Sequence, residues 1–488
     1  MSFDERHPDY GRAYADWVVI EDTYQGERQV KLRAFTYLPP TSGQLADGLL
    51  TDPQSPGRTA YEAYLTRAVF PEYVKEAVNT LVGVMHREPA DIQLPAALEP
   101  MRKLATKTGE SMEQLLRRIN EQQLLYGRFG LLADVTEGGT APHLVGYPAK
   151  AILNWDTSGG EFGTEKLALV VLDESGPVRS GFTWTDEKRY RALAVGDVGI
   201  PLDSAVAPTS YWTILEVAGS VQGVIVPRFG GRSLDRIPFV VIGANDLALC
   251  PDDIPLLGLA NLSLAIYRGE ADYRQTLFMQ AQDTLVVIGE EVDPEGQKKE
   301  EPTRVGCGAV LRLPQGGDAK YVGVQAAGLA EQRQALAADR TRAESRGSQL
   351  LQPPGSQAES GEALKVRVSA STASLFQIAK TGAAGLEQIL RVCALWVGVD
   401  PDQVRVTPNL EFAETVETPR SAQELMTAKT LGLPLSMRSI HQWLANNRFT
   451  TRTFEQEQEL LQSEPPLPAA PGPAPGRIDF LTPPPPGK

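Results

Sequence analysis

The segment from 253 to 351 constrains the fold of this 488-residue chain more than any other. It predicts a long helix, a Gly-rich and charged β excursion, and a second helix of matching length. The first helix has Pro255 in its first turn, where proline is favoured. Each helix is about 40 Å long at the α-helical rise. The pair therefore predicts an antiparallel strut with a β tip, which suits a ring or tunnel of many copies better than an enzyme.

Apolar spacing supports both helices of the strut. The first carries a stripe with a helical period, formed by Leu259, Leu262, Ile266, Tyr273 and Leu277. In the second, apolar residues recur seven positions apart, at Leu329, Leu336, Ala343 and Leu350.

Composition and charge limit the class of protein. Hydrophobic residues make up 42% of the chain, as in ordinary globular proteins. There is no run of eighteen apolar residues for a membrane span, and the charged, aromatic start predicts no signal peptide. The net charge of −14 argues against tight, sequence-independent nucleic-acid binding, although it permits weak, sliding contact.

Helices are also expected on either side of the strut. One over 60–87 should be broken by Pro71. Another over 111–126 begins with a Ser111–Gln114 capping box and ends at Gly127. A third, over 371–397, has small residues at 382–385 that predict a bend or close packing. Its core face is expected to contain Leu375, Ile378, Gly382, Ile389, Cys393 and Trp396.

Period-two patterns predict a β-rich region from about 128 to 250. The expected strands there are 129–135, 166–174, 211–219, 224–228 and 238–244. Further strands are expected at 284–289, 308–314 and 364–368. A small helical module follows at about 419–462, and the Pro-rich end cannot build a core.

Searching for catalytic chemistry gives little. The Gly-rich stretches 158–166 and 306–310 lack the spacing of a phosphate loop or dinucleotide fingerprint. Asp134 ends a buried strand, where a turn cap is favoured over a catalytic carboxylate. Metal or disulfide chemistry is not expected from three distant cysteines, interpreted as buried small hydrophobes, or from four dispersed histidines. They are Cys250, Cys307, Cys393, His7, His86, His143 and His441.

Two loops are the functional candidates, and each also has an interpretation that involves no function. The charged tip at 290–304 is either a solvated hairpin or a docking surface, with Lys298, Lys299, Glu300 and Arg304 as its candidate residues. The loop at 352–362 is either a flexible connector or, if copies ring a channel, a transient contact for a phosphate backbone. Its candidate residues are Gln352, Gln357, Lys365 and Arg367.

Six stretches in family order resemble the portal (connector) proteins of tailed bacteriophages, within the portal family long catalogued as a domain of unknown function. They cover most of 60–400 and lie at 64–89, 110–135, 146–156, 254–277, 329–351 and 370–398. The specificity comes from the ordered set, because no single motif is diagnostic.

The resemblance implies an α+β portal fold with a wing, a two-helix stem, a small α/β clip, a tunnel loop with a long wing helix, and a short helical crown. The Pro-rich tail makes a long crown barrel doubtful. The implied parts are wing 1–252, stem helix 253–282, clip 283–326, stem helix 327–351, tunnel loop 352–363, long wing helix 364–400, crown-like module 401–463 and tail 464–488.

The implied function is a homo-dodecameric ring at one capsid vertex, assembled in the host cytoplasm, through which double-stranded DNA is packaged and ejected. Implied partners are the terminase large subunit, a head–tail adaptor, and the major capsid and scaffolding proteins, with no membrane and no cofactor. Such a protein is not an enzyme. The alternatives are an intracellular hydrolase with an unrecognised site and another virion ring or adaptor, although the β-rich insert and strut argue against an adaptor.

Overall fold

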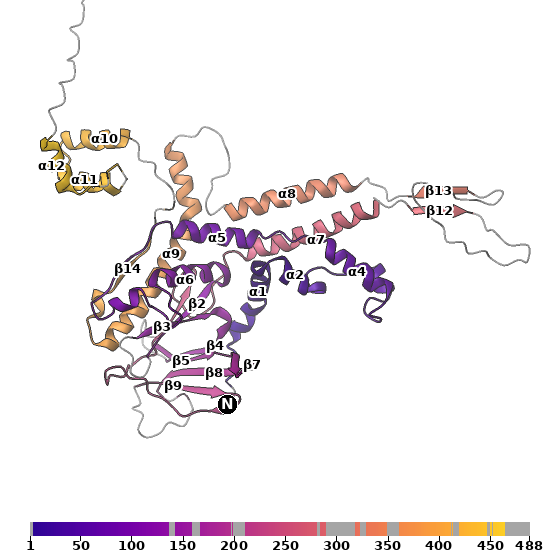
Figure 1. The fold of residues 1–488 in the computed structure, drawn as a ribbon, viewed down its shortest axis with the longest axis horizontal. Helices are drawn as coiled ribbons and strands as arrows, with labels where there is room; N and C mark the ends of the chain where they lie inside the picture. Colours follow the sequence, from indigo (N-terminus) through magenta and orange to yellow (C-terminus); the bar gives the residue numbers. More distant parts are fainter. Residues whose placement is uncertain are drawn as a thin grey trace, which may run out of the picture. The chain divides into compact units, whose positions relative to one another are not determined.

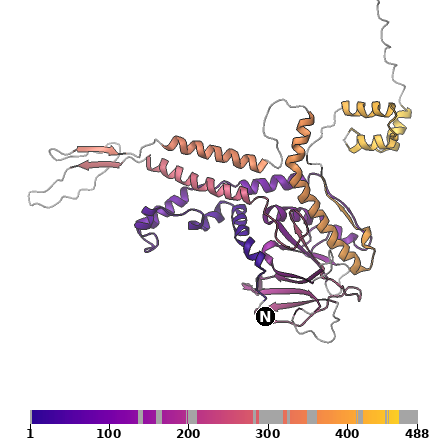
Figure 2. The same ribbon diagram turned by 180° about the vertical axis from the view of Figure 1, so that it is seen from behind.

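A computed structural model gives the fold (Figures 1 and 2). It describes residues 3–135, 142–158, 166–196, 198, 210–280, 284–288, 318–322, 328–348, 361–410, 412, 419–446, 449–450 and 452–463. These residues form two compact units, Met1–Phe412 and Ala413–Lys488. The chain is α+β, as predicted, because helices and antiparallel sheets share the first unit.

Helices account for much of both units. In the first unit they are α1 Pro8–Gln25, α2 Glu27–Leu32, η1 Ala34–Thr36, α3 Ser42–Ala46, α4 Pro56–Arg67, α5 Tyr73–Met85, η2 Glu99–Arg102, α6 Met112–Tyr126, η3 Ala149–Ala151, α7 Leu257–Gln280, α8 Leu329–Ser348, α9 Gly361–Val397 and η5 Pro401–Gln403. The second unit has the expected helical module, formed by α10 Pro419–Thr430, α11 Met437–Asn446 and α12 Phe454–Ser463. None of the helices in the described ranges has the length and apolarity to cross a bilayer.

Local sequence signals set several helix ends as predicted. The break at Pro71 separates α4 from α5. At the start of α6, the Gln114 N–H donates to Ser111 Oγ (3.3 Å) and the Ser111 N–H donates to Gln114 Oε1 (2.9 Å), which completes the capping box. Gly127 ends α6 with φ +64°, and a Cβ there would lie 2.8 Å from the Asp252 carbonyl oxygen. Only glycine therefore fits both the backbone angle and the contact.

The first strut helix begins later than predicted. The sequence places its start at Asp253, whereas α7 begins at Leu257. The preceding residues are held against the end of the sheet, since the Asn245 N–H donates to Asp252 Oδ2 (2.7 Å). Pro255 thus lies in the turn before the helix, where the Leu257 N–H donates to the Ile254 carbonyl (3.2 Å).

The strands form antiparallel sheets in the order β10-β9-β8-β5-β4, β11-β2-β3, β1-β14, β6-β7 and β12-β13. Their bounds are β1 Asp91–Gln93, β2 Arg128–Asp134, β3 His143–Pro148, β4 Ile152–Ser158, β5 Lys166–Asp173, β6 Gly176–Ser180, β7 Thr183–Glu187, β8 Arg189–Val195, β9 Tyr211–Val217, β10 Ser220–Val221, β11 Phe239–Gly243, β12 Thr284–Ile288, β13 Asp318–Val322 and β14 Arg405–Thr407. The predicted strands 129–135, 166–174, 211–219, 238–244 and 284–289 are confirmed as β2, β5, β9, β11 and β12.

Two strand predictions are wrong. Residues 224–228 make only an isolated bridge between Ile225 and Thr213, and Pro227 has no N–H with which to continue a ladder. Residues 364–368 belong to α9, because the helix extends ten residues further toward the N-terminus than the predicted start at 371. The predicted strand at 308–314 lies outside the described residues.

Helix α9 packs on the β11-β2-β3 sheet and on α6. The predicted core face of α9 is buried throughout. A Cβ on Gly385 would lie 2.4 Å from Ile242 of β11, and one on Gly382 would lie 2.4 Å from Asn120 of α6. The small residues at 382–385 thus serve close packing, the second of the two predicted possibilities. Cys393 is buried as expected, whereas Cys250 is exposed, contrary to the interpretation of all three as buried; Cys307 lies outside the described residues.

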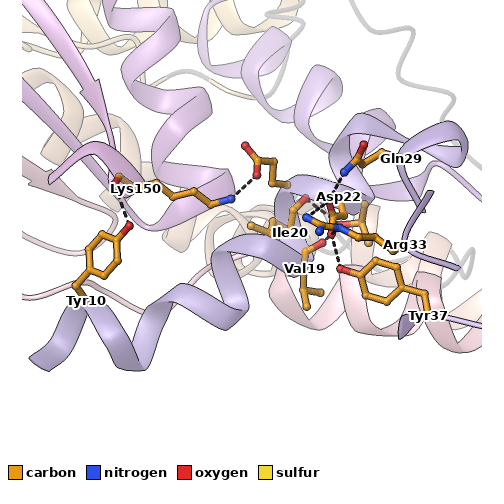
Figure 3. Close-up of polar contacts among 10 residues, drawn as sticks. Tyr10, Val19, Ile20, Asp22, Gln29, Arg33, Tyr37 and Lys150 are labelled. Atoms are coloured by element: carbon orange, nitrogen blue, oxygen red, sulfur yellow. Dashed lines mark hydrogen bonds and ion pairs between the residues drawn. The ribbon is translucent and has the colours of Figure 1, made fainter. Parts of the chain in front are cut away.

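A buried carboxylate fixes the N-terminal helices to one another (Figure 3). Asp22 of α1 is 0% exposed and accepts hydrogen bonds from Gln29 Nε2 (2.8 Å), Arg33 Nε (2.8 Å) and Tyr37 Oη (2.6 Å). Because all of these donors follow α1 in the chain, the network folds α2 and η1 back onto it. Burial of a charge is tolerated here because it is fully paired.

Candidate functional site: the α7–α8 helix pair

The seam between α7 and α8 is narrow. Gly269 of α7 faces Leu336 of α8, and a Cβ at Gly269 would lie 2.9 Å from Leu336 Cδ2. Leu336 and Ala343 are the buried apolar residues of α8, one heptad apart as predicted. Leu329 is half-buried, and Leu350 lies outside the described residues. Most of the remaining α8 surface is polar and exposed, so a single chain buries only one thin stripe of this helix.

A charged cluster reinforces the seam. Glu270 is 5% exposed, and its carboxylate accepts hydrogen bonds from Arg274 Nε (2.7 Å) on α7 and Arg340 Nη2 (2.5 Å) on α8. Both arginines remain nearly half exposed at their side chains. Glu270 therefore links the two helices through charge-assisted hydrogen bonds at the edge of the apolar stripe.

Sequence reasoning missed Glu270, although a signal was present. It lies four residues after Ile266 and three before Tyr273, both of which belong to the predicted stripe. A glutamate within an apolar helical face is expected to be buried and paired. Its partner Arg340 is seventy residues away in sequence, so the pattern alone does not identify it.

On its other side, α7 is held by α4. The Tyr64 hydroxyl donates to Asp272 Oδ1 (2.5 Å), and Arg67 Nη2 donates to Gln275 Oε1 (2.5 Å). Burial and the hydrogen bond to Asp272 raise the pKa of Tyr64 above its ordinary value, so the phenol stays protonated and acts as the donor. The guanidinium of Arg67 lies 4.0 Å from the ring centroid of Phe278.

The end of α7 is less covered. Within the predicted stripe, Leu259 and Ile266 are buried, Leu262 and Tyr273 are half-buried, and Leu277 is exposed. Phe278 and Met279 beside it are also exposed, at 38% and 48%. Beyond this end, β12 pairs with β13 from Thr284 opposite Val322 to Ile288 opposite Asp318. The chain order α7, β12, β13, α8 and the packing of α7 on α8 confirm the predicted helix pair with a β element between its helices, although β13 was not among the predicted strands.

Most of the other predicted site residues cannot be placed. Lys298, Lys299, Glu300, Arg304, Gln352 and Gln357 lie outside the described residues. Lys365 and Arg367 lie within the first turns of α9 and not on a strand; their side chains are outside the described part. The alternating Lys-Val-Arg-Val pattern suggested a strand, but the helix that begins at Gly361 continues through it.

A buried polar chain holds α9 against α6, since Asn120 Nδ2 donates to the Ile378 carbonyl of α9 (3.5 Å). Gln123 Nε2 donates to the Gly243 carbonyl (2.6 Å), and Asn120 Nδ2 donates to Gln123 Oε1 (2.8 Å). The Oδ1 atom of Asn120 therefore faces His86 Nε2 at 2.8 Å and accepts a hydrogen bond from it. Residues of α6, β11 and the C-terminal cap of α5 are joined in this way directly beneath Gly382.

Asp134 is placed as a structural group. Its Oδ1 accepts the Val135 N–H (2.9 Å), as a strand-end cap does, and its Oδ2 is paired with Arg191 Nη1 (3.0 Å). Arg191 also pairs with Glu174 (2.8 Å), which accepts the Tyr147 hydroxyl (2.6 Å). These contacts tie the three-stranded sheet to the five-stranded one. Within the described ranges, no group of three or more His, Cys, Asp or Glu side chains is arranged to hold a metal.

Comparison with protein families gives one match. The family described as "Domain of unknown function (DUF4055)" matches residues 255–397, the segment that contains α7, β12, β13, α8 and α9. This match confirms the resemblance to a family catalogued as a domain of unknown function. No curated protein matches the chain.

Three of the solved structures that are similar to the chain come from gene transfer agent particles. A chain in "Virion of native gene transfer agent (GTA) particle" is 14% identical with a TM-score of 0.38, covering 90% of this chain and 99% of that one. A chain in "Neck of empty GTA particle computed with C6 symmetry" is 14% identical with a TM-score of 0.37, covering 87% and 94%. A chain in "Neck of native GTA particle computed with C12 symmetry" is 15% identical with a TM-score of 0.36, covering 83% and 92%.

Proposed function

We propose that this chain is a portal subunit: a homo-oligomeric ring of a virion, located at one capsid vertex, whose channel carries double-stranded DNA during packaging and ejection. The observation that carries the proposal is the α7–α8 pair, which lies in the segment matched by the family of unknown function. Its helices of 24 and 20 residues are about 36 Å and 30 Å long. The ordered set of portal-like stretches supports the same assignment.

A single chain leaves part of the surface of the α7–α8 pair uncovered. The exposed apolar end of α7 and the thinly covered α8 leave surface that another copy can bury. In a ring these surfaces meet head to tail, through heterologous contacts that close on themselves. No covalent chemistry is required of such a subunit, which acts as a scaffold and gate. The net charge of −14 suits a conduit in which DNA must slide and not adhere.

The proposed parts follow the described elements. The wing comprises the helices and sheets before α7; the stem is α7 and α8; the clip contains β12 and β13; and α9 is the long wing helix. The crown-like module is proposed over 401–463, which contains η5, β14, α10, α11 and α12, and the tail over 464–488. The partners proposed are further copies of this chain, a terminase, a head–tail adaptor, and capsid and scaffolding proteins.

Electron microscopy of the purified chain tests the proposal. We expect rings with a central channel, and twelve subunits by the resemblance. A chain that stays a compact monomer or dimer, both alone and when produced with its capsid and scaffolding proteins, would contradict the proposal. Turnover of a hydrolase substrate by that small species would favour the enzyme alternative.

The tunnel loop is proposed to touch DNA. Gln352 and Gln357 lie in it, and Lys365 and Arg367 follow in the first turns of α9. Deleting 353–360 leaves α9 intact, so we expect rings to form while DNA packaging or retention fails. Loss of ring assembly in this deletion would show that the loop acts at the subunit interface.

The tip residues Lys298, Lys299, Glu300 and Arg304 are proposed to dock the terminase or adaptor. Reversing the charge at Lys298 and Lys299 should weaken terminase binding, measured by pull-down on preformed rings, and spare assembly. The matched control reverses the exposed Lys103 and Lys107 of the wing, and should leave binding unchanged. Equal binding by both variants would refute docking at the tip.

A further inference from the structure

Arg128, the first residue of β2, is a buried cation without a hydrogen-bond partner. Its side chain is 0% exposed, and Nε, Nη1 and Nη2 all lack an acceptor among the described residues. Other buried charges of the first unit are different, since Asp22 and Glu270 both pair with arginine. A guanidinium presents several N–H donors and stays charged, so leaving all of them unpaired in the interior is costly and calls for an explanation.

The groups around Arg128 stabilise its charge without supplying an acceptor. The guanidinium lies 3.9 Å from the ring centroid of Trp155, and the His7 ring stacks on the same indole at 4.1 Å. Burial lowers the pKa of Arg128 to about 9, which leaves it charged at neutral pH. The indole face attracts the cation through its π electrons, but it offers no lone pair that could accept hydrogen bonds from the N–H groups.

The two nearby acidic groups do not provide the missing anion. Burial and a hydrogen bond to Asp9 raise the pKa of the Cys250 thiol, so it is neutral at pH 7. The Asp9 carboxylate is already engaged, by Arg12 Nη1 (2.7 Å) and by the Cys250 thiol (3.6 Å). The negative charge of Asp9 attracts Arg128 through space, without a hydrogen bond between the two side chains.

A cavity adjoins the residues that surround Arg128, although Arg128 itself is not among its lining residues. It has a volume of about 540 Å³ and is lined by His7, Trp155 and Cys250, with Phe239 and Leu249 among its apolar residues. His7 is the N-cap of the 18-residue helix α1, whose positive dipole end therefore borders the cavity. Trp155, over whose ring the guanidinium lies, and Cys250, which is near enough for the charge of Arg128 to act on its thiol, therefore both belong to the cavity wall.

Cys250, which lies near Arg128, lines this cavity. Cys250 is exposed and also lines a second cavity of about 570 Å³, so its small side chain has space to move. Asp156 in the cavity lining is exposed, and its Oδ1 accepts the Thr157 N–H (2.8 Å). Solvent and this hydrogen bond therefore screen the repulsion that Asp156 would exert on an incoming anion.

We propose that this cavity is an anion-binding site, in which a carboxylate or phosphate oxyanion accepts hydrogen bonds from Arg128 once the Cys250 side chain moves aside. The planar guanidinium matches either oxyanion through two parallel hydrogen bonds. Stacking on Trp155 holds the guanidinium plane in place for this pairing. The oxyanion has two sources: a free anion in solution, or an acidic side chain of a second copy of this chain, in which 61 acidic residues exceed 47 basic ones.

The test measures the thermal unfolding of the full-length chain at low concentration in chloride, inorganic phosphate and acetate at equal ionic strength. Self-association is followed by sedimentation in the same buffers. Arg128→Met removes the guanidinium that would bind the anion. Cys250→Phe places a bulky side chain between the cavity and Arg128 while keeping Arg128. The control Arg58→Met changes an exposed arginine whose partner is Glu62 on its own helix.

A saturable rise of the unfolding temperature with phosphate or acetate is expected for the wild type and for Arg58→Met. We expect at least about tenfold weaker anion affinity in Arg128→Met and Cys250→Phe, because charge-assisted hydrogen bonds are lost. If dilute wild type shows no such rise, but phosphate and Arg128→Met both reduce self-association while Arg58→Met does not, the anion is an acidic side chain of a second copy.

The absence of both an anion response and an association defect would overturn the proposal. If Arg128→Met does not fold, the decision rests on Cys250→Phe. An unchanged anion response and unchanged association in that variant would show that the cavity does not lead to Arg128.

Discussion

Two helix contacts in the first unit use glycine, yet only one of them is complete within a single chain. In the body, Gly382 and Gly385 of α9 meet α6 and β11, and the α9 face around them is buried from Leu375 to Trp396. In the strut, Gly269 of α7 meets Leu336, but most of α8 remains exposed. The α9 contact in the body is therefore fully buried within one chain. The strut instead has a narrow apolar seam between α7 and α8, supported by the ion pairs of Glu270. This difference supports the proposed ring, in which a neighbouring copy would cover the exposed face of the strut.

The largest effect is expected in the body, from Gly385→Val. The new side chain would overlap Ile242, because even its Cβ would lie 2.4 Å from that residue. Overpacking should lower the free energy of unfolding by about 3 kcal/mol, as measured by denaturant titration. The matched control is Gly83→Ala in α5, where nothing lies within 4 Å of a new Cβ. It should raise stability by about 0.5–1 kcal/mol through helix propensity. Equal effects of the two substitutions would contradict the tight α9 contact.

In the strut, Glu270→Ala should have a smaller and more local effect. Removing a buried carboxylate can cost about 3–5 kcal/mol, but Arg274 and Arg340 are nearly half exposed and can be hydrated after its loss. We therefore expect a loss of about 1–2 kcal/mol. Hydrogen exchange should quicken in α7 and α8 and stay unchanged in α9.

A double-mutant cycle with Arg340→Met isolates the contact between the helices. If Glu270 acts through Arg340, the double variant should lose less stability than the sum of the two single variants. Additive losses, or faster exchange throughout α9, would show that the strut and body do not behave as separate regions.

The body and strut also differ in how far the sequence predicts them. Local signals were sufficient for the α6 capping box, the break at Pro71 and the heptad of Leu336 and Ala343, because each depends on neighbouring residues in one element. At 382–385 they left a bend or close packing open, and the contacts with α6 and β11 decide in favour of close packing. The ion pairs of Asp22 and Glu270 needed the fold, since they join residues from different elements. Strands β3, β4 and β8 were not predicted; their pairing in the sheets fixes them more than their own patterns do.

Errors at element boundaries have equally specific causes. Pro255 resembles a first-turn proline, but the hydrogen bond from Asn245 to Asp252 holds the chain out of the helix until Leu257. The pattern at 364–368 alternates as a strand does, yet it directly precedes a strong helical pattern and is absorbed into α9. The candidate site was predictable as a strut; Arg128 was not singled out, because an arginine at a strand start carries no local sign of its burial.

The smallest expected effect concerns pH and the polar chain beneath α9. Burial is the main cause that lowers the pKa of His86 below its ordinary value of 6.5, and the same holds for His143. The unfolded chain therefore binds protons near pH 6.5 that the folded chain binds only at lower pH. Stability is fully present above this value and falls as the pH drops through it, by less than about 1.4 kcal/mol per pH unit for each histidine.

Denaturant unfolding between pH 8 and pH 5.5 measures this loss of stability. His86→Gln keeps a donor for Asn120 Oδ1 and cannot be protonated, so its stability should fall less steeply than that of the wild type over the same range. His143→Gln should act in the same direction, and the double variant should be the flattest. A slope in His86→Gln equal to that of the wild type would mean that His86 is reached by water in the folded chain, and that the contact beneath α9 is as open as the strut.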